Sequence, residues 1–315
     1  MTGQRTTSLH PTESSMKNAT KYYGNFVILL SSSTDQQDQP VIKSLVYVIL
    51  FICLLGLVGN GLVLWFLGFH IKRNAFTVYV LNLAAADFGF LLCLALSCTV
   101  FDFNLLYLSM SLDLLMVFTY STRLSFLTAI SVERCASVLC SIWYRSYCPK
   151  HLSAILCALL WALSCLLTGL KAYVCFSDSC SEHRQEILLQ LTRMNFQIFT
   201  PIIVLTSLIL IIKVQRSSLR HQPRKLYIVI SLNVLFFLLL IVSFSIVTFF
   251  QKAINYDYFI NSSLMLAPIN SSINPVIYFL IGSYRNQQFG GSVKKALRSM
   301  FEEEADIREE RVSAT

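Results

Sequence analysis

Seven long apolar runs constrain the fold of this chain more than any other feature of its sequence. Each is about 20 residues or longer and nearly free of charge, which is the length that an α-helix needs to cross the roughly 30 Å hydrocarbon core of a bilayer. The chain has 315 residues, of which 13% are charged and 55% are hydrophobic. The runs are Ile42–Phe69, Phe76–Cys98, Leu105–Val138, Leu152–Val174, Ile187–Val214, Leu226–Phe250 and Tyr258–Ile281. The sequence therefore predicts an all-α fold, a seven-transmembrane helix bundle whose two ends lie on opposite sides of the membrane.

The distribution of Lys and Arg predicts which loops face the cytoplasm, because short loops rich in these residues stay on that side. Basic residues gather after the first, third, fifth and seventh runs, at Lys72, Arg73, Arg134, Arg145, Lys150, Lys213, Arg216, Arg220, Arg224, Lys225, Arg285, Lys294, Lys295 and Arg298. The opposite loops hold only Lys171, Arg184, Arg193 and Lys252, mixed with acidic residues. The N-terminus is therefore predicted to be extracellular, and the net charge of +8 reflects this orientation rather than nucleic-acid binding.

Three regions follow from this orientation: a disordered extracellular tail over 1–41, the membrane domain over 42–282, and a cytoplasmic tail over 283–315 with a short amphipathic helix. The first tail lacks a cleavable signal pattern, so the first run is expected to direct insertion. Extracellular candidates for modification are the glycosylation sequons at Asn18 and Asn261, and a disulfide between Cys175 and Cys180 in the outer loop after the fourth run. Unpaired cysteines that serve as small packing residues are the alternative to the disulfide.

Four polar side chains are predicted to lie at one depth inside the bundle. Counting 1.5 Å per residue from the cytoplasmic ends of their runs places them roughly 16 to 18 Å deep. They are Asn60, Asp87, Arg123 and Asn270. A lone charge at such a depth costs about 2.5–3.5 kcal/mol, so Asp87 and Arg123 are candidates for an intramembrane functional site. Asparagines in membrane helices also simply hydrogen-bond helices together, which is at least part of the role expected for Asn60.

Two short motifs lie near the predicted cytoplasmic face. Glu133 and Arg134 form a charged pair at the end of the third run. The seventh run contains Asn274–Tyr278, which reads NPVIY. Here Pro275 removes a backbone donor inside a helix, and Asn274 can bond the groups that are freed. Such a weak point suits a hinge, but it is equally typical of a helix that is kinked and static.

Taken together, these residues resemble the rhodopsin-like G-protein-coupled receptors across nearly the whole of the seven runs. The matching elements occur in order along the chain, namely Gly59-Asn60, residues 83–87, Glu133-Arg134-Cys135, Trp161, Pro201 and Asn274–Tyr278. The wording is closer still to the Mas-related subfamily: residues 74–88 read NAFTVYVLNLAAADF, 127–135 read LTAISVERC, 142–145 read IWYR and 158–165 read ALLWALSC. The resemblance implies a plasma-membrane receptor, without a cofactor or metal, that binds an extracellular peptide or small molecule and activates a heterotrimeric G protein.

The same resemblance implies roles for individual residues near the cytoplasmic face. Arg134 is expected to help engage the G protein once the sixth helix moves outward, while Asn274 and Tyr278 repack inward. Two features depart from the family pattern. Ser109 stands where a cysteine bridge to the second outer loop is usual, and the sixth run contains neither proline nor tryptophan. How a ligand moves the sixth helix is therefore left open.

A further role implied by the resemblance concerns Asp87. In many related receptors this aspartate, a small polar residue of the third helix and asparagines of the seventh hold a sodium ion. Here the third-helix member is Arg123, whose guanidinium brings its own positive charge and several donors. We expect it to replace sodium beside Asp87, Asn60 and Asn270, and the alternative is a side chain that faces away and snorkels.

Ligands of this family enter among the outer ends of the helices. The candidate pocket residues are Asp113, Met116, Tyr120, Lys171 and Arg193. Lys171 and Arg193 make the predicted mouth mixed in charge rather than acidic, which favours a carboxylate-bearing ligand over a polycation. The alternative is that both side chains snorkel to lipid headgroups.

Other functions fit the sequence less well. Transporters tend to show paired repeats and several broken helices, and neither half of this chain repeats the other. A retinal pigment needs a lysine in the seventh run, which has none. An enzyme is not expected, because the five histidines lie in loops or tails and no carboxylate pair lies within a run.

Overall fold

The computed structural model describes residues 39–70, 75–100, 106–139, 152–176, 198–199, 201–209, 212 and 266–279. Its four long helices are α3 (Gln39–Phe69), α4 (Ala75–Val100), α5 (Leu106–Leu139) and α7 (Leu152–Phe176), which correspond to the first four predicted runs. Residues 201–209 and 266–279 are also helical and fall within the fifth and seventh runs. Helix α3 begins at Gln39, so the last residues of the predicted extracellular tail over 1–41 belong to the first helix. The sixth run, residues 1–38 and the cytoplasmic tail with its expected amphipathic helix lie outside the described residues.

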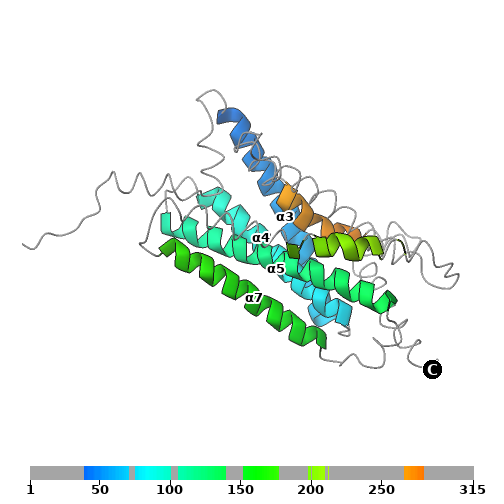
Figure 1. Ribbon diagram of the computed structural model, residues 1–315. Helices are drawn as coiled ribbons and strands as arrows, with labels where there is room; N and C mark the ends of the chain where they lie inside the picture. Colours follow the sequence, from blue (N-terminus) through cyan, green and yellow to red (C-terminus); the bar gives the residue numbers. More distant parts are fainter. Residues whose placement is uncertain are drawn as a thin grey trace, which may run out of the picture.

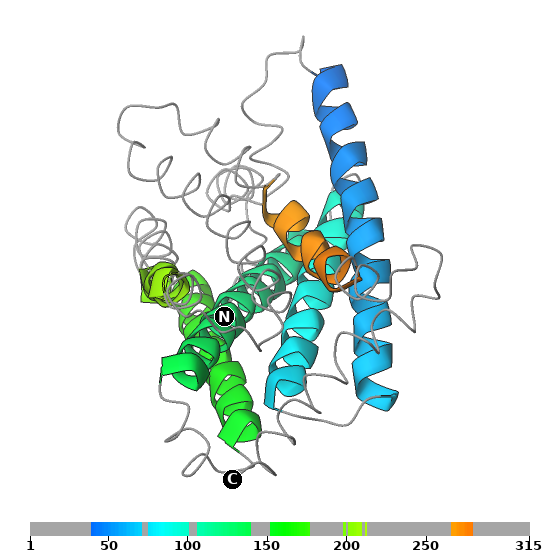
Figure 2. The same cartoon turned by 90° about the vertical axis from the view of Figure 1, so that its right-hand side faces the viewer.

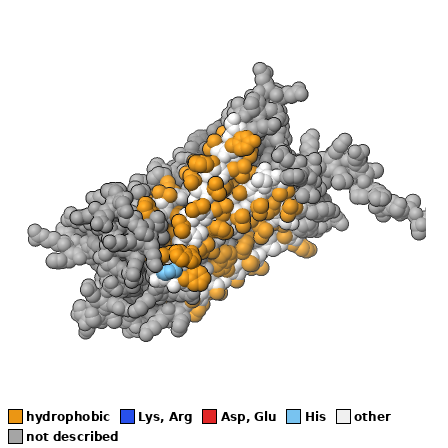
Figure 3. Space-filling model, turned by 180° about the vertical axis from the view of Figure 1, so that it is seen from behind, with side chains coloured by type: hydrophobic (Ala, Val, Ile, Leu, Met, Phe, Trp, Pro, Cys, Tyr) orange, Lys and Arg blue, Asp and Glu red, His pale blue; other side chains and the backbone are white. Residues whose placement is uncertain are grey.

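All four long helices have the length and apolar character of membrane spans, with apolar stretches of 19 to 26 residues. Large hydrophobic side chains remain exposed on the outer faces of α3 and α7, as at Phe51 (62%) and Leu166 (70%). Figure 3 shows hydrophobic side chains over the described part of one face, with no charged side chain among them. A surface of this kind is stable against lipid, which is as apolar as the side chains that face it.

Helices α4 and α5 form the centre of the described bundle. Helix α5 packs against α4 and α7, and α4 packs against all three of the other long helices, as the two ribbon views show (Figures 1 and 2). Within the apolar stretches, 61% of the residues of α5 and 56% of those of α4 are buried, against 28% in α3 and 17% in α7. Three buried hydroxyl side chains of α5 have hydrogen-bond partners within the helix, because Thr119, Thr122 and Ser125 each donate to a backbone carbonyl about one turn earlier. The centre of the bundle can therefore hold a polar helix.

The seventh-run segment 266–279 lies along α3, where it is drawn in orange (Figure 2). The two backbones approach closely at two glycines. A Cβ atom added at Gly56 would lie 2.6 Å from Leu91 Cδ1 and would also meet the Ser272 hydroxyl, and one added at Gly59 would lie 3.0 Å from Pro275 Cβ. The Ser272 hydroxyl donates to the Ile52 carbonyl at 3.1 Å. The glycines of α3 thus allow the segment that carries Asn274 and Pro275 to pack closely against this helix.

Helix α7 is joined to the bundle through Trp161. Its indole Nε1 donates to Asn82 Oδ1 of α4 at 2.9 Å, and the ring also packs against Phe118 and Phe126 of α5. A buried indole needs a partner for its N–H. One residue therefore fixes α7 to both of its neighbours.

The end of α7 corrects one detail of the sequence-based interpretation. The helix continues to Phe176, so Cys175 lies in its last turn rather than in the outer loop. Residues 172–176, which read AYVCF, are apolar and precede Ser177 and Asp178, which explains the longer helix. Cys180 lies outside the described residues, and its bridge to Cys175 stays a prediction.

Candidate functional site

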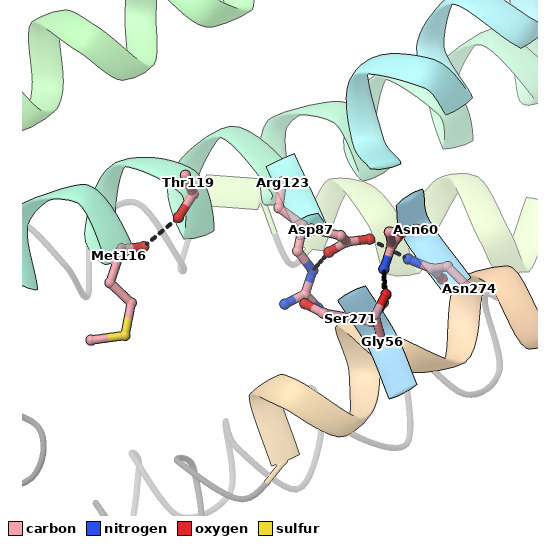
Figure 4. A network of polar contacts seen from close by, with 8 residues as sticks. All are labelled: Gly56, Asn60, Asp87, Met116, Thr119, Arg123, Ser271 and Asn274. Atoms are coloured by element: carbon pink, nitrogen blue, oxygen red, sulfur yellow. Dashed lines mark hydrogen bonds and ion pairs between the residues drawn. The ribbon is translucent and has the colours of Figure 1, made fainter. Parts of the chain in front are cut away.

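A buried ion pair joins α4 to α5 at the centre of the bundle. Arg123 Nε lies 3.1 Å from Asp87 Oδ1, and the two side chains are 1% and 0% exposed (Figure 4). The atoms are close enough for an ion pair but are not aligned as a hydrogen bond, so the contact is chiefly electrostatic. The side chain of Arg123 points into the bundle and not toward a membrane surface. Each charge compensates the other where water cannot do so.

The second carboxylate oxygen of Asp87 ties the seventh-run segment to the same centre. Asn274 Nδ2 donates to Asp87 Oδ2 at 2.8 Å (Figure 4). Asn274 directly precedes the buried Pro275, so the hydrogen bond is made at the weak point of the helix. Asp87 thereby connects α4 to α5 through charge and to segment 266–279 through a hydrogen bond.

Asn60 joins α3 to this centre by a different route. Its Nδ2 donates to the Gly56 carbonyl at 2.9 Å and to the Ser271 carbonyl at 3.1 Å. The amide therefore bonds backbone groups of two helices rather than Asp87 itself. Such a contact holds α3 and segment 266–279 together.

Asn270 is buried, at 7% exposure, but the seventh-run residue that donates to Asp87 is Asn274. The prediction that Asn270 takes part in the polar site stays a prediction, and the hydrogen bond to Asp87 comes from the residue one helical turn further along. The two asparagines share a face of the segment because they are four residues apart. Depth counting from the end of a run does not distinguish neighbouring turns, and the sequence alone identifies Asn274 only as part of the NPVIY motif.

The charge balance of this site is closed by the protein's own side chains. Asp87 and Arg123 carry one charge of each sign. No group of three or more His, Cys, Asp or Glu side chains that could hold a metal ion occurs among the described residues. The contacts of Asp87 can hold α4, α5 and segment 266–279 in one relative position. Movement of Asn274 or Arg123 would break one of these contacts and release the corresponding element.

Nearer the predicted cytoplasmic face, Arg134 lies on an aromatic ring. Its guanidinium carbon Cζ is 3.8 Å from the ring centroid of Phe76 at the start of α4. Phe76 belongs to an apolar cluster with Phe66 of α3 and with Ile277 and Tyr278 of segment 266–279. The two motifs found in the sequence are therefore connected through this cluster.

Toward the predicted outer face, two of the candidate pocket residues have described side chains. Met116 is buried at 7% exposure in a cluster with Phe90 and Leu94 of α4. Tyr120 packs against the same cluster, and its ring centroid lies 5.6 Å from Arg123 Cζ. Tyr120 thus connects the cluster around Met116 to the ion pair.

The helices include Asp113 and Lys171, but their side chains lie outside the described part of the structure, as do all of Arg193, Asn18 and Asn261. Two residues with clear contacts were not foreseen. Phe76 gave no signal beyond being the first residue of an apolar run, and Asn82 is an isolated polar residue of a span, a signal that could have been used.

Comparisons with known proteins agree with this architecture. The family model for the 7 transmembrane receptor (rhodopsin family) matches residues 59–278. The chain is 38% identical over 283 residues to the Rattus norvegicus protein called Proto-oncogene Mas, covering 86% of this chain and 87% of that protein. It is 36% identical over 273 residues to Mas-related G-protein coupled receptor member D of Macaca fascicularis, covering 82% and 85% of the two chains.

A third relative extends the same pattern. Mas-related G-protein coupled receptor member X2 of Homo sapiens is 42% identical over 258 residues, covering 77% of each chain. The matched family region contains the ion pair, the Glu133–Arg134 pair and the NPVIY stretch. With its seven apolar runs, this chain is a multi-pass plasma-membrane protein and belongs to the rhodopsin-like G-protein-coupled receptors, in the Mas-related family.

Proposed function

We propose that an extracellular ligand enters among the outer ends of the helices and that Arg134 then engages a heterotrimeric G protein at the cytoplasmic ends. The observation that supports this best is the hydrogen bond from Asn274 to Asp87 at 2.8 Å. It attaches the proline-containing segment to the ion pair below Tyr120. A shift of α5 at the ligand side would move Arg123, and through Asp87 it would change the positions of Asn274 and Tyr278.

Reconstitution of the purified chain in liposomes tests this proposal. Nucleotide exchange would be measured on purified G proteins of each class, and flux of small solutes would be measured on the same vesicles. We expect exchange with at least one class, a loss of that exchange in Arg134→Ala, and no flux. Solute flux without exchange would instead favour a transporter and contradict the proposal.

The charge of the ligand is predicted by the basic residues near the outer mouth. We expect small carboxylic acids or acidic peptides to dissociate the G protein more effectively than basic peptides. Lys171→Glu should weaken the response to an active acid by about tenfold or more, because it replaces attraction by repulsion.

Lys252→Glu is the matched control, since it makes the same charge change in the predicted outer loop between the sixth and seventh runs, whereas Lys171 lies near the end of α7. It should leave the acid response near that of the parent. Activation by basic peptides that is unaffected by Lys171→Glu would contradict the prediction.

A further inference from the structure

The contact between Arg134 and Phe76 has the geometry of a cation stacked on an aromatic face. The distance from Cζ to the ring centroid is 3.8 Å, and Phe76 is 5% exposed. The face of an aromatic ring carries partial negative charge, and the attraction of a guanidinium to it grows where water is excluded. The ring therefore attracts Arg134 although it bears no formal charge.

The ring cannot follow Arg134 when the arginine moves, because Phe76 is held in a packed cluster. Its neighbours in that cluster come from three elements, namely Val63, Phe66 and Leu67 of α3, Val80 and Ala84 of α4, and Ile277 and Tyr278 of segment 266–279. Close-packed clusters of this kind change between discrete arrangements rather than deform gradually. A movement of Tyr278 would therefore alter the platform on which Arg134 rests.

The charge pattern of the sequence indicates why an aromatic contact to Arg134 would matter. Residues 187–256, which contain the fifth and sixth runs, include no Asp or Glu. These runs cannot offer Arg134 a carboxylate. An aromatic face on α4 supplies attraction from another direction, and it is weaker and easier to release than a buried ion pair.

We infer that Phe76 is a positioning residue that holds Arg134 against α4 in the unliganded receptor, so that release of Arg134 from this ring is a step in activation. The inference rests on the proposed function, in which Arg134 engages the G protein. It adds the residue that restrains Arg134 before that engagement and links it to Tyr278 through the shared cluster.

The first test reads the contact itself and needs no G protein. The purified full chain in detergent would be treated with an arginine-selective dicarbonyl reagent, and the modification of Arg134 would be followed by mass spectrometry. Phe76→Leu should speed this modification by about two- to tenfold, because the attraction to the ring is lost. Phe76→Tyr keeps the aromatic face and should stay near the parent rate.

Phe66→Leu is the matched control. Phe66 belongs to the same cluster and is 2% exposed, so the substitution removes the same volume from the same core. Its ring stacks on His70 and not on Arg134. It should match Phe76→Leu in loss of thermal stability without exposing Arg134 to the reagent.

The second test measures ligand-free nucleotide exchange with the same preparations in liposomes. Phe76→Leu should raise basal exchange by about two- to tenfold over the parent, whereas Phe66→Leu should not. If the two leucine variants behave alike in both tests, the inference is wrong while exchange by the parent still supports the proposed function. If Arg134 responds to the reagent as expected but no preparation catalyses exchange with any G protein, the proposed function and the activation role of Phe76 both fall.

Discussion

Asp87→Asn and Arg123→Ser should each strongly reduce the amount of receptor at the cell surface, and the double variant should recover part of that loss. Each single change leaves one charge buried without its partner, at a cost of about 3–5 kcal/mol. That cost is a large part of the stability of an ordinary protein. The 3.1 Å contact and the exposures of 1% and 0% give neither charge access to water. The double variant removes both charges, so only the lost packing and hydrogen bonding remain.

Surface labelling of intact cells, normalised to total receptor, measures this effect. Asn82→Ser is a suitable control, because it alters another polar contact of α4, which is partly buried, without creating an unpaired charge. Losses that simply add in the double variant would mean that the two side chains are not energetically coupled.

The same variants bear on sodium. Ligand-free or ligand-driven signalling of the parent should not change when sodium is replaced by a large inert cation, because Arg123 already supplies the positive charge beside Asp87. Arg123→Ser removes that charge and should acquire sodium sensitivity. A parent whose signalling falls as sodium is added would contradict this role of Arg123.

Ligand-free signalling should be readily measurable, which is the second large effect that we expect. Many relatives hold the arginine of the third helix to an acidic residue at the foot of the sixth helix, and residues 187–256 of this chain have no Asp or Glu. Loss of one such contact, about 1–2 kcal/mol, would raise a minor active population roughly five- to thirty-fold. The contact of Arg134 with Phe76 offsets only part of this loss.

G-protein dissociation in cells without added ligand, at matched surface expression, measures the basal signal. A carboxylate introduced at the predicted foot of the sixth helix, as in Lys225→Glu, should lower it, and Lys225→Gln is the control that removes the positive charge alone. A basal signal no greater than in cells lacking the receptor would contradict the prediction.

The sequence was most informative where a single physical rule dominates. Because spans in lipid must be apolar, the ends of the first four predicted runs lie within three residues of the ends of α3, α4, α5 and α7. Depth counting placed Asp87 and Arg123 at one level, and the structure brings them within 3.1 Å. Burial of two opposite charges leaves few other arrangements, so this pair was accessible to reasoning from the sequence.

Contacts that depend on helix rotation were less accessible. The choice of Asn274 over Asn270 beside Asp87 is a matter of one turn, and depth alone does not resolve it. The position of Phe76 under Arg134 joins residues 58 positions apart and depends on how α4 packs against α5. Apolar residues give no such signal, because any of them can face the core.

The ion pair also has a consequence for how the chain is made. If α4 left the translocon alone, Asp87 would enter lipid without compensation at about 2.5–3.5 kcal/mol, and Arg123 would do the same in α5. If the two helices enter lipid together as a hairpin, the two charges are paired between them and neither faces the lipid alone. Biosynthesis should therefore retain α4 at the translocon until α5 has been synthesised, so that the two are released together and the bundle is assembled around this hairpin.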